Sequence, residues 1–247
     1  MDLRLAALFP DLLNLYGDRG NVLVLQSRAR RRGIPVEVLP VGLGHPLPDA
    51  DLYLLGGGED RQQALVAPAL EALRPQLEAA VRSGAVVLGV CGGYQLLGHA
   101  YYAADGSVLR GVGLLDVVTR HPGHRAPRLV GNAAVACVLD GVGTLVGFEN
   151  HGGRTWLGAN ARPLGRVLAG FGNNGRDRTE GAWAGTVFGT YLHGPLLPKN
   201  PAFADYLLRL ALRRRFGDVH LSPLDDRWEH AAHVRAAERA GVRLRGA

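Results

Sequence analysis

The fold is decided by one stretch, Gly84-Ala85-Val86-Val87-Leu88-Gly89-Val90-Cys91-Gly92-Gly93-Tyr94-Gln95-Leu96-Leu97-Gly98. Residues 85–90 are apolar and rich in β-branched side chains, which predicts a buried strand of a parallel sheet. Two glycines end the run, and apolar residues then recur at helical spacing as far as Tyr101. The stretch therefore predicts a strand, a sharp turn at Cys91 and a helix.

A cysteine in that position has the setting of a nucleophile elbow, with a thiol in place of the usual serine hydroxyl. Gly89 and Gly93 keep the turn free of side-chain clashes, and Gly92 and Gly93 can adopt φ values that other residues resist. The thiol would lie at a helix N-terminus, where partial positive charge lowers its pKa and favours the thiolate. We therefore interpret Cys91 as a nucleophile. The alternative is a buried core cysteine, as we expect for Cys137, which has no such elbow.

Strands alternate with helices on the N-terminal side of this stretch. The sequence predicts strands over 3–9, 35–39 and 51–55, a helix over 21–32 capped by Asn21, and a helical pattern over 61–82 interrupted at Pro68 and Pro75. Such alternation implies right-handed βαβ units, hence an α/β protein with a mostly parallel sheet flanked by helices.

The pattern changes after Gly106, where short strands are joined by glycine-rich turns. The predicted strands are 114–118, 128–139, 144–149, 166–169 and 187–191, and the predicted helices are 201–216 and 228–240. We expect this half to be partly antiparallel. We also expect one domain over 1–216 and a helical tail, 217–247, docked on the same domain.

Composition and charge exclude several classes of protein. The net charge of +6 comes almost entirely from arginine, because Lys199 is the only lysine. The arginine clusters fall at the ends of predicted helices and are not interleaved with aromatic residues, so we expect no nucleic-acid binding. No run of about 18 apolar residues exists, and residues 1–4 lack the pattern of a signal peptide. We expect a protein that is not integral to a membrane, with two reduced cysteines and a cytoplasmic location.

Attack of a thiol on an amide needs a base and donors for the oxyanion. His193 is the candidate base, because it follows the predicted strand 187–191 and lies at the edge where open α/β sheets place their sites. His151, in a polar run flanked by glycines, is a rival base in a segment that could equally be a structural turn. A Walker-type phosphate loop is absent, because the one lysine lies in Leu197-Pro198-Lys199-Asn200.

Residues 89–95 resemble the G-x-C-x-G-x-Q signature of class I, triad-type glutamine amidotransferases. Other segments resemble the cobyric-acid-synthase-like branch of that family, and within it the GatD-type glutaminase subunits of lipid II isoglutaminyl synthases. These segments are Leu13-Asn14-Leu15-Tyr16-Gly17-Asp18, Gly56-Gly57-Gly58-Glu59-Asp60-Arg61, Gly147-Phe148-Glu149-Asn150-His151-Gly152-Gly153-Arg154-Thr155 and Gly189-Thr190-Tyr191-Leu192-His193-Gly194-Pro195. The resemblance implies the class I amidotransferase fold and hydrolysis of L-glutamine through a cysteinyl thioester.

The resemblance also implies partners. The ammonia would pass to a separate ATP-dependent, MurT-like Mur-ligase synthetase subunit in a heterodimer, with the D-glutamate of lipid II as acceptor. The glutaminase itself would need no cofactor and no metal. By the same resemblance Cys91 and His193 would be catalytic, and the N–H groups of Gly58 and Gly92 would form the oxyanion hole.

Two substrate contacts follow from the resemblance. Gln95 would contact the glutamine substrate through its amide, and Arg128 would pair with the substrate α-carboxylate, which suits the forked guanidinium. From the residues alone the glycines 56–58 are also consistent with a plain turn, Gln95 with a helix-capping or surface amide, and Arg128 with a surface arginine.

One departure from the family pattern concerns the third catalytic residue. Many class I members have His-x-Glu, whose carboxylate orients the histidine, whereas Gly194 and Pro195 follow His193 here. The sequence leaves two interpretations, a dyad that works poorly alone or an acid supplied from elsewhere, the partner included. Rival functions are a cobyric-acid-synthase-type amidotransferase of cobalamin biosynthesis, a non-catalytic scaffold, and a cysteine hydrolase of the related peptidase-like group.

Overall fold

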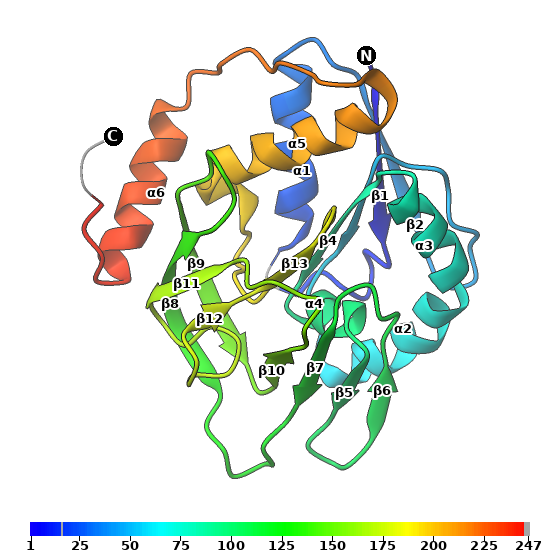
Figure 1. The fold of residues 1–247 in the computed structure, drawn as a ribbon, viewed down its shortest axis with the longest axis vertical. Helices are drawn as coiled ribbons and strands as arrows, with labels where there is room; N and C mark the ends of the chain where they lie inside the picture. The colour runs from blue at the N-terminus through cyan, green and yellow to red at the C-terminus, as the bar shows by residue number, and fades with distance from the viewer. Residues whose placement is uncertain (16, 245–247) are drawn as a thin grey trace.

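The centre of the molecule is a six-stranded sheet with the strand order β13-β14-β4-β3-β1-β2 (Figure 1). It is seen in a computed structural model that describes residues 1–15 and 17–244. Neighbouring strands run parallel except β13, which pairs antiparallel with β14 at one edge. The strands are β1 (Leu3–Leu8), β2 (Val36–Val41), β3 (Leu52–Leu55), β4 (Val86–Val90), β13 (Ala182–Ala184) and β14 (Val187–Thr190). The predicted α/β class is confirmed.

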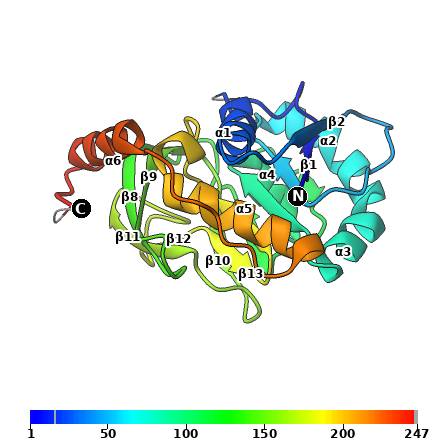
Figure 2. The same ribbon diagram turned by 90° about the horizontal axis from the view of Figure 1, so that it is seen from above.

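Helices cover both faces of this sheet. β1 connects to β2 through α1 (Arg19–Arg30), whereas β3 connects to β4 in the opposite direction through α2 (Asp60–Ala72) and α3 (Arg74–Arg82). Right-handed crossovers in opposite directions place their helices on opposite faces. Accordingly α1 packs with α5 (Pro201–Phe216) on one side, and α2 and α3 lie on the other (Figure 2). The central strand β4 is therefore buried along its whole length, which explains its wholly apolar sequence.

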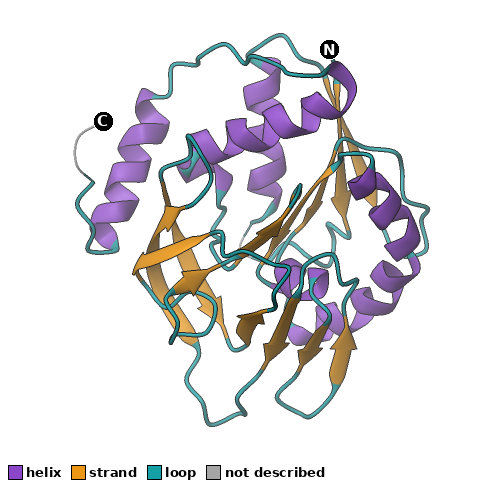
Figure 3. Ribbon diagram, viewed as in Figure 1, coloured by secondary structure: helices purple, strands orange, loops and turns teal. Residues whose placement is uncertain are grey.

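Two four-stranded sheets make up much of the second half of the chain (Figure 3). Their orders are β10-β7-β5-β6 and β12-β11-β8-β9, and all neighbours pair antiparallel except β5 and β7. The strands are β5 (Ala100–Tyr102), β6 (Val108–Arg110), β7 (Val117–Arg120), β8 (Leu129–Cys137), β9 (Thr144–His151), β10 (Arg154–Leu157), β11 (Gly165–Ala169) and β12 (Thr179–Glu180). The expectation of a partly antiparallel half is confirmed.

The β8–β9 ladder is tied to the central sheet at one point. Phe148 of β9 and His193, just beyond β14, exchange both backbone hydrogen bonds, with N···O distances of 3.2 and 2.9 Å. The antiparallel layer is thus joined to the central sheet just beyond the end of β14, at the candidate base.

The last helix, α6 (Arg227–Arg239), lies against β8 and β9. Its Ala237 packs with Ala134 and Val146 in a small apolar cluster beside the main core. Trp228 in its first turn stays 77% exposed, so this helix buries little beyond its alanine face. Within the described part of the chain, no helix is both long enough and apolar enough to cross a bilayer.

The first helix corrects one prediction from the sequence. The N-cap residue is Asp18, so Asn21 lies inside the first turn and does not cap the helix. Asn21 is fully buried, and its side-chain oxygen accepts a hydrogen bond from the Leu197 N–H at 2.8 Å. Leu197 is the first residue of the 3-10 helix η1 (Leu197–Lys199). The Asn21 side chain therefore bonds this distant segment and does not provide the α1 cap that the local pattern predicts.

Other element boundaries also depend on distant partners. Pro75 lies at the predicted break between α2 and α3, but α2 continues through Pro68. The elbow helix α4 (Gly92–Leu97) ends earlier than predicted, because Ala100–Tyr102 pairs with two other strands as β5. The strand predicted over 114–118 begins only at Val117.

The arginine cluster near the end of α1 binds carboxylates of the chain itself. Arg28, only 3% exposed, hydrogen-bonds in bidentate fashion to Asp205 of α5 and to Asp226 just before α6, at 2.7–2.8 Å. Arg32 also binds Asp205, at 2.6 Å. These carboxylates hold the pKa of Arg28 above its usual range despite burial. The cluster therefore joins α1 to α5 and to the start of α6.

Replacing Arg28 with alanine should destabilise the protein strongly, because Asp205 and Asp226 would lose their shared cation in a partly buried site. We expect the free energy of unfolding to fall by about 3–5 kcal/mol in chemical denaturation. Arg82→Ala is the matched control, since Arg82 is 71% exposed and 3.8 Å from its partner Glu78. Its expected effect lies within about 0.5 kcal/mol, and equal losses in the two variants would contradict the structural role of Arg28.

Candidate active site

Cys91 directly follows β4 and directly precedes α4. Its backbone has φ 52° and ψ −107°, a conformation that costs a non-glycine residue on the order of 1–3 kcal/mol. Glycine at position 93 lets the turn close, because a Cβ there would stand 2.6 Å from the carbonyl oxygen of Leu55. The predicted strand, sharp turn and helix are confirmed.

The pairing of β4 with β14 brings Cys91 and His193 to the same edge of the sheet. Thr190 lies opposite Val90 in the parallel ladder, and the Cys91 N–H donates to the Thr190 carbonyl oxygen at 2.8 Å. Cys91 is one residue beyond this pair and His193 is three residues beyond it. Strand register therefore places the nucleophile and the candidate base at the same edge of the sheet.

The Cys91 thiol is buried, with 6% of the residue exposed. Burial raises the pKa of the thiol to about 12, the nearby Asp18 carboxyl adds to this rise, and a hydrogen bond from the Gly92 N–H opposes it. The expectation of a lowered pKa at the helix N-terminus is therefore wrong. The reason is that α4 is short and its positive end is outweighed by loss of water around the sulfur.

His193 is fully buried, and its ring packs edge-on against Phe148 with centroids 5.7 Å apart. Burial lowers the pKa of its imidazole to about 4, and the neighbouring His151, Lys199 and Arg128 lower it further. At neutral pH the site therefore holds a neutral thiol and a neutral imidazole. A neutral imidazole is the form that can accept a proton.

The glycine loop Gly56-Gly57-Gly58, between β3 and α2, lies beside the elbow. A Cβ on Gly57 would stand 3.3 Å from the Cys91 Cβ, and one on Gly92 would stand 3.0 Å from the Gly58 nitrogen. Asp18 holds this loop, because its Oδ2 accepts a hydrogen bond from the Gly57 N–H at 2.7 Å. The backbones of the two predicted oxyanion donors are thus in close contact.

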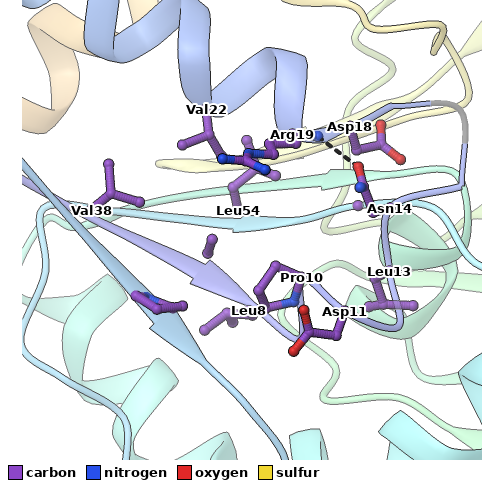
Figure 4. Close-up of a pocket in the computed structure, with 13 residues that line it drawn as sticks. Leu8, Pro10, Asp11, Leu13, Asn14, Asp18, Arg19, Val22, Val38 and Leu54 are labelled. Carbon is purple, nitrogen blue, oxygen red and sulfur yellow. Dashed lines mark hydrogen bonds between the residues drawn. The ribbon is translucent and has the colours of Figure 1, made fainter.

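Asp18 also lines a cavity of about 430 Å³ between the start of α1 and the ends of β1 and β2. Figure 4 shows the Asp18 carboxylate directed away from Val22 and Val38, which line the opposite side of the cavity. Burial raises the pKa of Asp18 to about 6, against the hydrogen bond from Gly57. The acid that holds the glycine loop is therefore poised to titrate near neutral pH.

Gln95 belongs to a buried polar cluster one turn into α4. Its Nε2 donates to the Tyr191 hydroxyl at 3.1 Å, and that hydroxyl lies 2.6 Å from the Thr155 Oγ1. The His151 ring stacks on the Tyr191 ring with centroids 3.6 Å apart. The His151 Nδ1 lies 2.8 Å from the carbonyl oxygen of Gly153, so His151 is packed into the wall of the site.

Glu149 lies on the same strand as His151 and is fully buried. Its carboxylate accepts hydrogen bonds from the N–H groups of Phe171 and Gly172, and its Oε2 is 3.9 Å from the His151 Nε2. The buried carboxylate of this wall is thus engaged with a loop and with His151.

Arg128 lies at the exposed rim, just before β8. Its guanidinium donates to the Asn150 side-chain and backbone oxygens at 2.8 and 2.9 Å. The charge of Arg128 nevertheless lowers the pKa of both Cys91 and His193, so the guanidinium lies within electrostatic range of the two residues. His121 lies close by, since a Cβ on Gly152 would stand 2.5 Å from its Nε2 and 3.5 Å from an Arg128 nitrogen.

The second cysteine lacks this setting. Cys137 is half-buried at the end of β8 and packs against the main core. Burial raises the pKa of its thiol to about 11. In residues 1–15 and 17–244, no group of three or more His, Cys, Asp or Glu side chains is arranged to hold a metal ion.

Comparison with models of protein families shows which family the chain belongs to. The model of the CobB/CobQ-like glutamine amidotransferase domain matches residues 4–201. The chain belongs to this family. Two solved structures share the fold, a glutamine amidotransferase (TM-score 0.57, 17% identity, 83% of this chain and 98% of that one) and PurLQS from Thermotoga maritima (TM-score 0.58, 20% identity, 78% and 88%).

Three curated relatives narrow the branch of the CobB/CobQ-like family. The GatD subunit of lipid II isoglutaminyl synthase (glutamine-hydrolyzing) from Staphylococcus aureus N315 is 43% identical over 83% of this chain and 82% of its own length. The GatD subunit from Streptococcus pneumoniae R6 is 37% identical over 91% and 86%. A cobyric acid synthase from Novosphingobium aromaticivorans is 35% identical over 83% of this chain, but over only 38% of its own length.

For this CobB/CobQ-like domain the structure gathers most of the residues singled out in the sequence. Cys91, Gly92 and Gly58 are in mutual proximity, His193 lies across the strand pair, and Gln95 follows by one turn. Arg128 lies at the rim. Three neighbours of the site had no role in the sequence analysis, Asp18, His121 and Tyr191. Asp18 and Tyr191 fall inside the segments that resemble the family, which was the available signal, whereas nothing local marks His121.

The imidazole of His193 should stay neutral at about pH 5.5, because its pKa is lowered to about 4 from an ordinary value of ~6.5. A pH titration by ¹⁵N NMR of labelled histidine rings, with His193→Gln to assign the signal, measures this directly. Since the unfolded chain binds this proton more readily, the same shift removes folding free energy as the pH falls from ~6.5 toward 4. A ring that titrates near its ordinary value would contradict the buried, neutral base.

Proposed function

We propose that this protein is the glutaminase subunit of an enzyme that amidates the D-glutamate of lipid II, the precursor of peptidoglycan. The single observation that carries the proposal is the strained Cys91 elbow in a chain 43% identical to a GatD subunit over most of both lengths. In this proposal L-glutamine is hydrolysed in the cytoplasm, and the ammonia passes to a MurT-like Mur-ligase synthetase subunit that uses ATP.

The proposed reaction begins with proton transfer from the Cys91 thiol to the neutral His193 imidazole as the sulfur attacks the carboxamide carbon of glutamine. The N–H groups of Gly58 and Gly92 donate to the resulting oxyanion. The imidazolium then protonates the leaving nitrogen, which releases ammonia and leaves a thioester on Cys91. A water molecule, deprotonated by His193, attacks the thioester, and glutamate leaves as the thiol forms again.

Two further residues have proposed roles in binding glutamine. Arg128 faces the α-carboxylate of the substrate, supported by its place at the rim and by its influence on the pKa of Cys91. Gln95 contacts the substrate through its side-chain amide. Its position one turn after Cys91 supports this role, since the Gln95 backbone N–H donates to the Cys91 carbonyl oxygen at 3.1 Å.

The alternative acceptor is a corrinoid, as in cobyric acid synthase. The relative of that name supports it at 35% identity, but this chain matches little more than a third of that relative's length. The two readings share the glutaminase chemistry and differ only in the ammonia acceptor. Amidation of lipid II, or of a corrinoid carboxylate, by the chain with its synthetase partner separates them.

Cys91→Ala should abolish glutamine hydrolysis while the thermal unfolding temperature shows an intact fold. An electrophilic glutamine analogue should label Cys91 and spare Cys137, which lies outside the site and packs against the core. Peptide mapping by mass spectrometry identifies the labelled thiol. Turnover that persists in Cys91→Ala, or label found mainly on Cys137, would show that Cys91 is not the nucleophile.

The lone chain should hydrolyse glutamine slowly and gain rate with its synthetase. Burial raises the pKa of the thiol to about 12 and lowers the pKa of the base to about 4, so proton transfer between them is unfavourable. A partner carboxylate near His193, or a better ordered glycine loop, would favour the transfer. The test is glutaminase activity titrated with the MurT-like subunit, then with variants of its acidic surface residues. A lone chain already at full rate contradicts the prediction.

A further inference from the structure

Tyr191 lies two residues before His193 and is fully buried, yet the proposed reaction gives it no task. It is held on every side. Its backbone N–H donates to the Glu180 Oε1 at 2.8 Å, one ring face stacks on His151 at 3.6 Å, and Tyr94 meets the ring edge-on at 5.2 Å. A tyrosine clamped in this way presents its hydroxyl at a defined point.

That hydroxyl is the acceptor for the Gln95 carboxamide nitrogen, at 3.1 Å. The same hydroxyl lies 2.6 Å from the Thr155 Oγ1, which in turn lies 2.7 Å from the Thr119 Oγ1. Because the tyrosine oxygen accepts from Gln95, its own proton is free to serve Thr155. A reversed carboxamide would need that proton for the Gln95 oxygen, and Thr155 would then have to donate to the tyrosine oxygen instead of accepting from it.

Packing also holds the carboxamide in place. A Cβ on Gly153 would stand 2.7 Å from the Gln95 Nε2, so the carboxamide nitrogen is lodged against the Gly153 backbone. The planar amide then turns its oxygen away from Tyr191 and Gly153. The amide ends in N–H donors on one side and an acceptor oxygen on the other, and because Tyr191 binds the donor side, the acceptor side is the one turned toward a ligand.

We propose that Tyr191 is a positioning residue that fixes the direction of the Gln95 carboxamide, so that the site offers an acceptor oxygen to a donor group of the substrate. This rests on the proposed function, because it assumes that Gln95 contacts glutamine. It adds a residue and a direction to that contact. The donor on the substrate is its α-ammonium group or its carboxamide N–H.

The test is a double-mutant cycle on KM for glutamine with the wild type, Tyr191→Phe, Gln95→Ala and the double variant. Tyr191→Phe removes only the hydroxyl, and we expect KM to rise about fivefold, the size of one net hydrogen bond, while kcat changes less than about twofold. In the Gln95→Ala background the same change should have no further effect, because Tyr191 acts through Gln95. Additive effects, or an unchanged KM in Tyr191→Phe, overturn the proposal.

Tyr94→Phe is the matched control. Tyr94 is equally buried and touches Tyr191, but its hydroxyl bonds Asn173 at 3.2 Å and not Gln95. We expect its KM to match the wild type, and a rise equal to that of Tyr191→Phe would show general loosening of the core and overturn the proposal.

Two further arms keep the test decisive. If Tyr191→Phe does not fold, Thr155→Ala removes the anchor of the hydroxyl instead, and should raise KM where Thr155→Ser does not; equal KM values in these two variants overturn the proposal. Where turnover is slow, the dissociation constant of glutamine on the Cys91→Ala background replaces KM. Loss of wild-type turnover in Cys91→Ala tests the glutaminase itself, so failure of the cycle and failure of the proposed function are distinguishable.

Discussion

The register between β4 and β14 is the constraint on which the rest of the molecule depends. Val90 faces Thr190 across the parallel ladder, and the next residue, Cys91, closes the last hydrogen bond onto Thr190. Because the two strands end together, the Cys91 elbow and His193, which follows β14, must lie at the same edge of the sheet. The antiparallel layer is joined to the same point through the Phe148–His193 bridge. The polar residues that follow Phe148 on β9, Glu149 and His151, therefore lie at the edge of the sheet that carries Cys91.

Burial, more than charge, sets the chemistry of the resting site. It raises the pKa of Cys91 and lowers that of His193, and both shifts favour the neutral form. Such a site avoids a buried ion pair whose desolvation would cost several kcal/mol. Its reactivity then depends on what a bound substrate adds to the local field. The Asp18 carboxyl, which holds the glycine loop, also raises the pKa of Cys91, so both burial and charge favour the neutral thiol.

The strain at Cys91 persists because its surroundings determine it from several sides. Glycine at position 93 admits the carbonyl of Leu55 where a side chain would collide, and Asp18 fixes the loop that closes over the turn. Similar logic runs through the wall of the site, where the Tyr191 hydroxyl is shared between Gln95 and Thr155. A hydrogen-bonded polar cluster of this kind favours one arrangement of side chains.

The sequence by itself determined the elements whose signal is local. The buried run 85–90, the glycines after Cys91 and the alternation of strands and helices were enough to place an elbow in an α/β sheet, because strand burial and turn geometry depend on neighbouring residues. Tertiary structure alone decided what depends on distant partners. The Asn21 side chain bonds Leu197 instead of capping α1. Burial raises the pKa of the Cys91 thiol, although its place at a helix N-terminus predicted a lowered one. The direction of Gln95 was likewise set by a tyrosine ninety-six residues away, which no local pattern encodes.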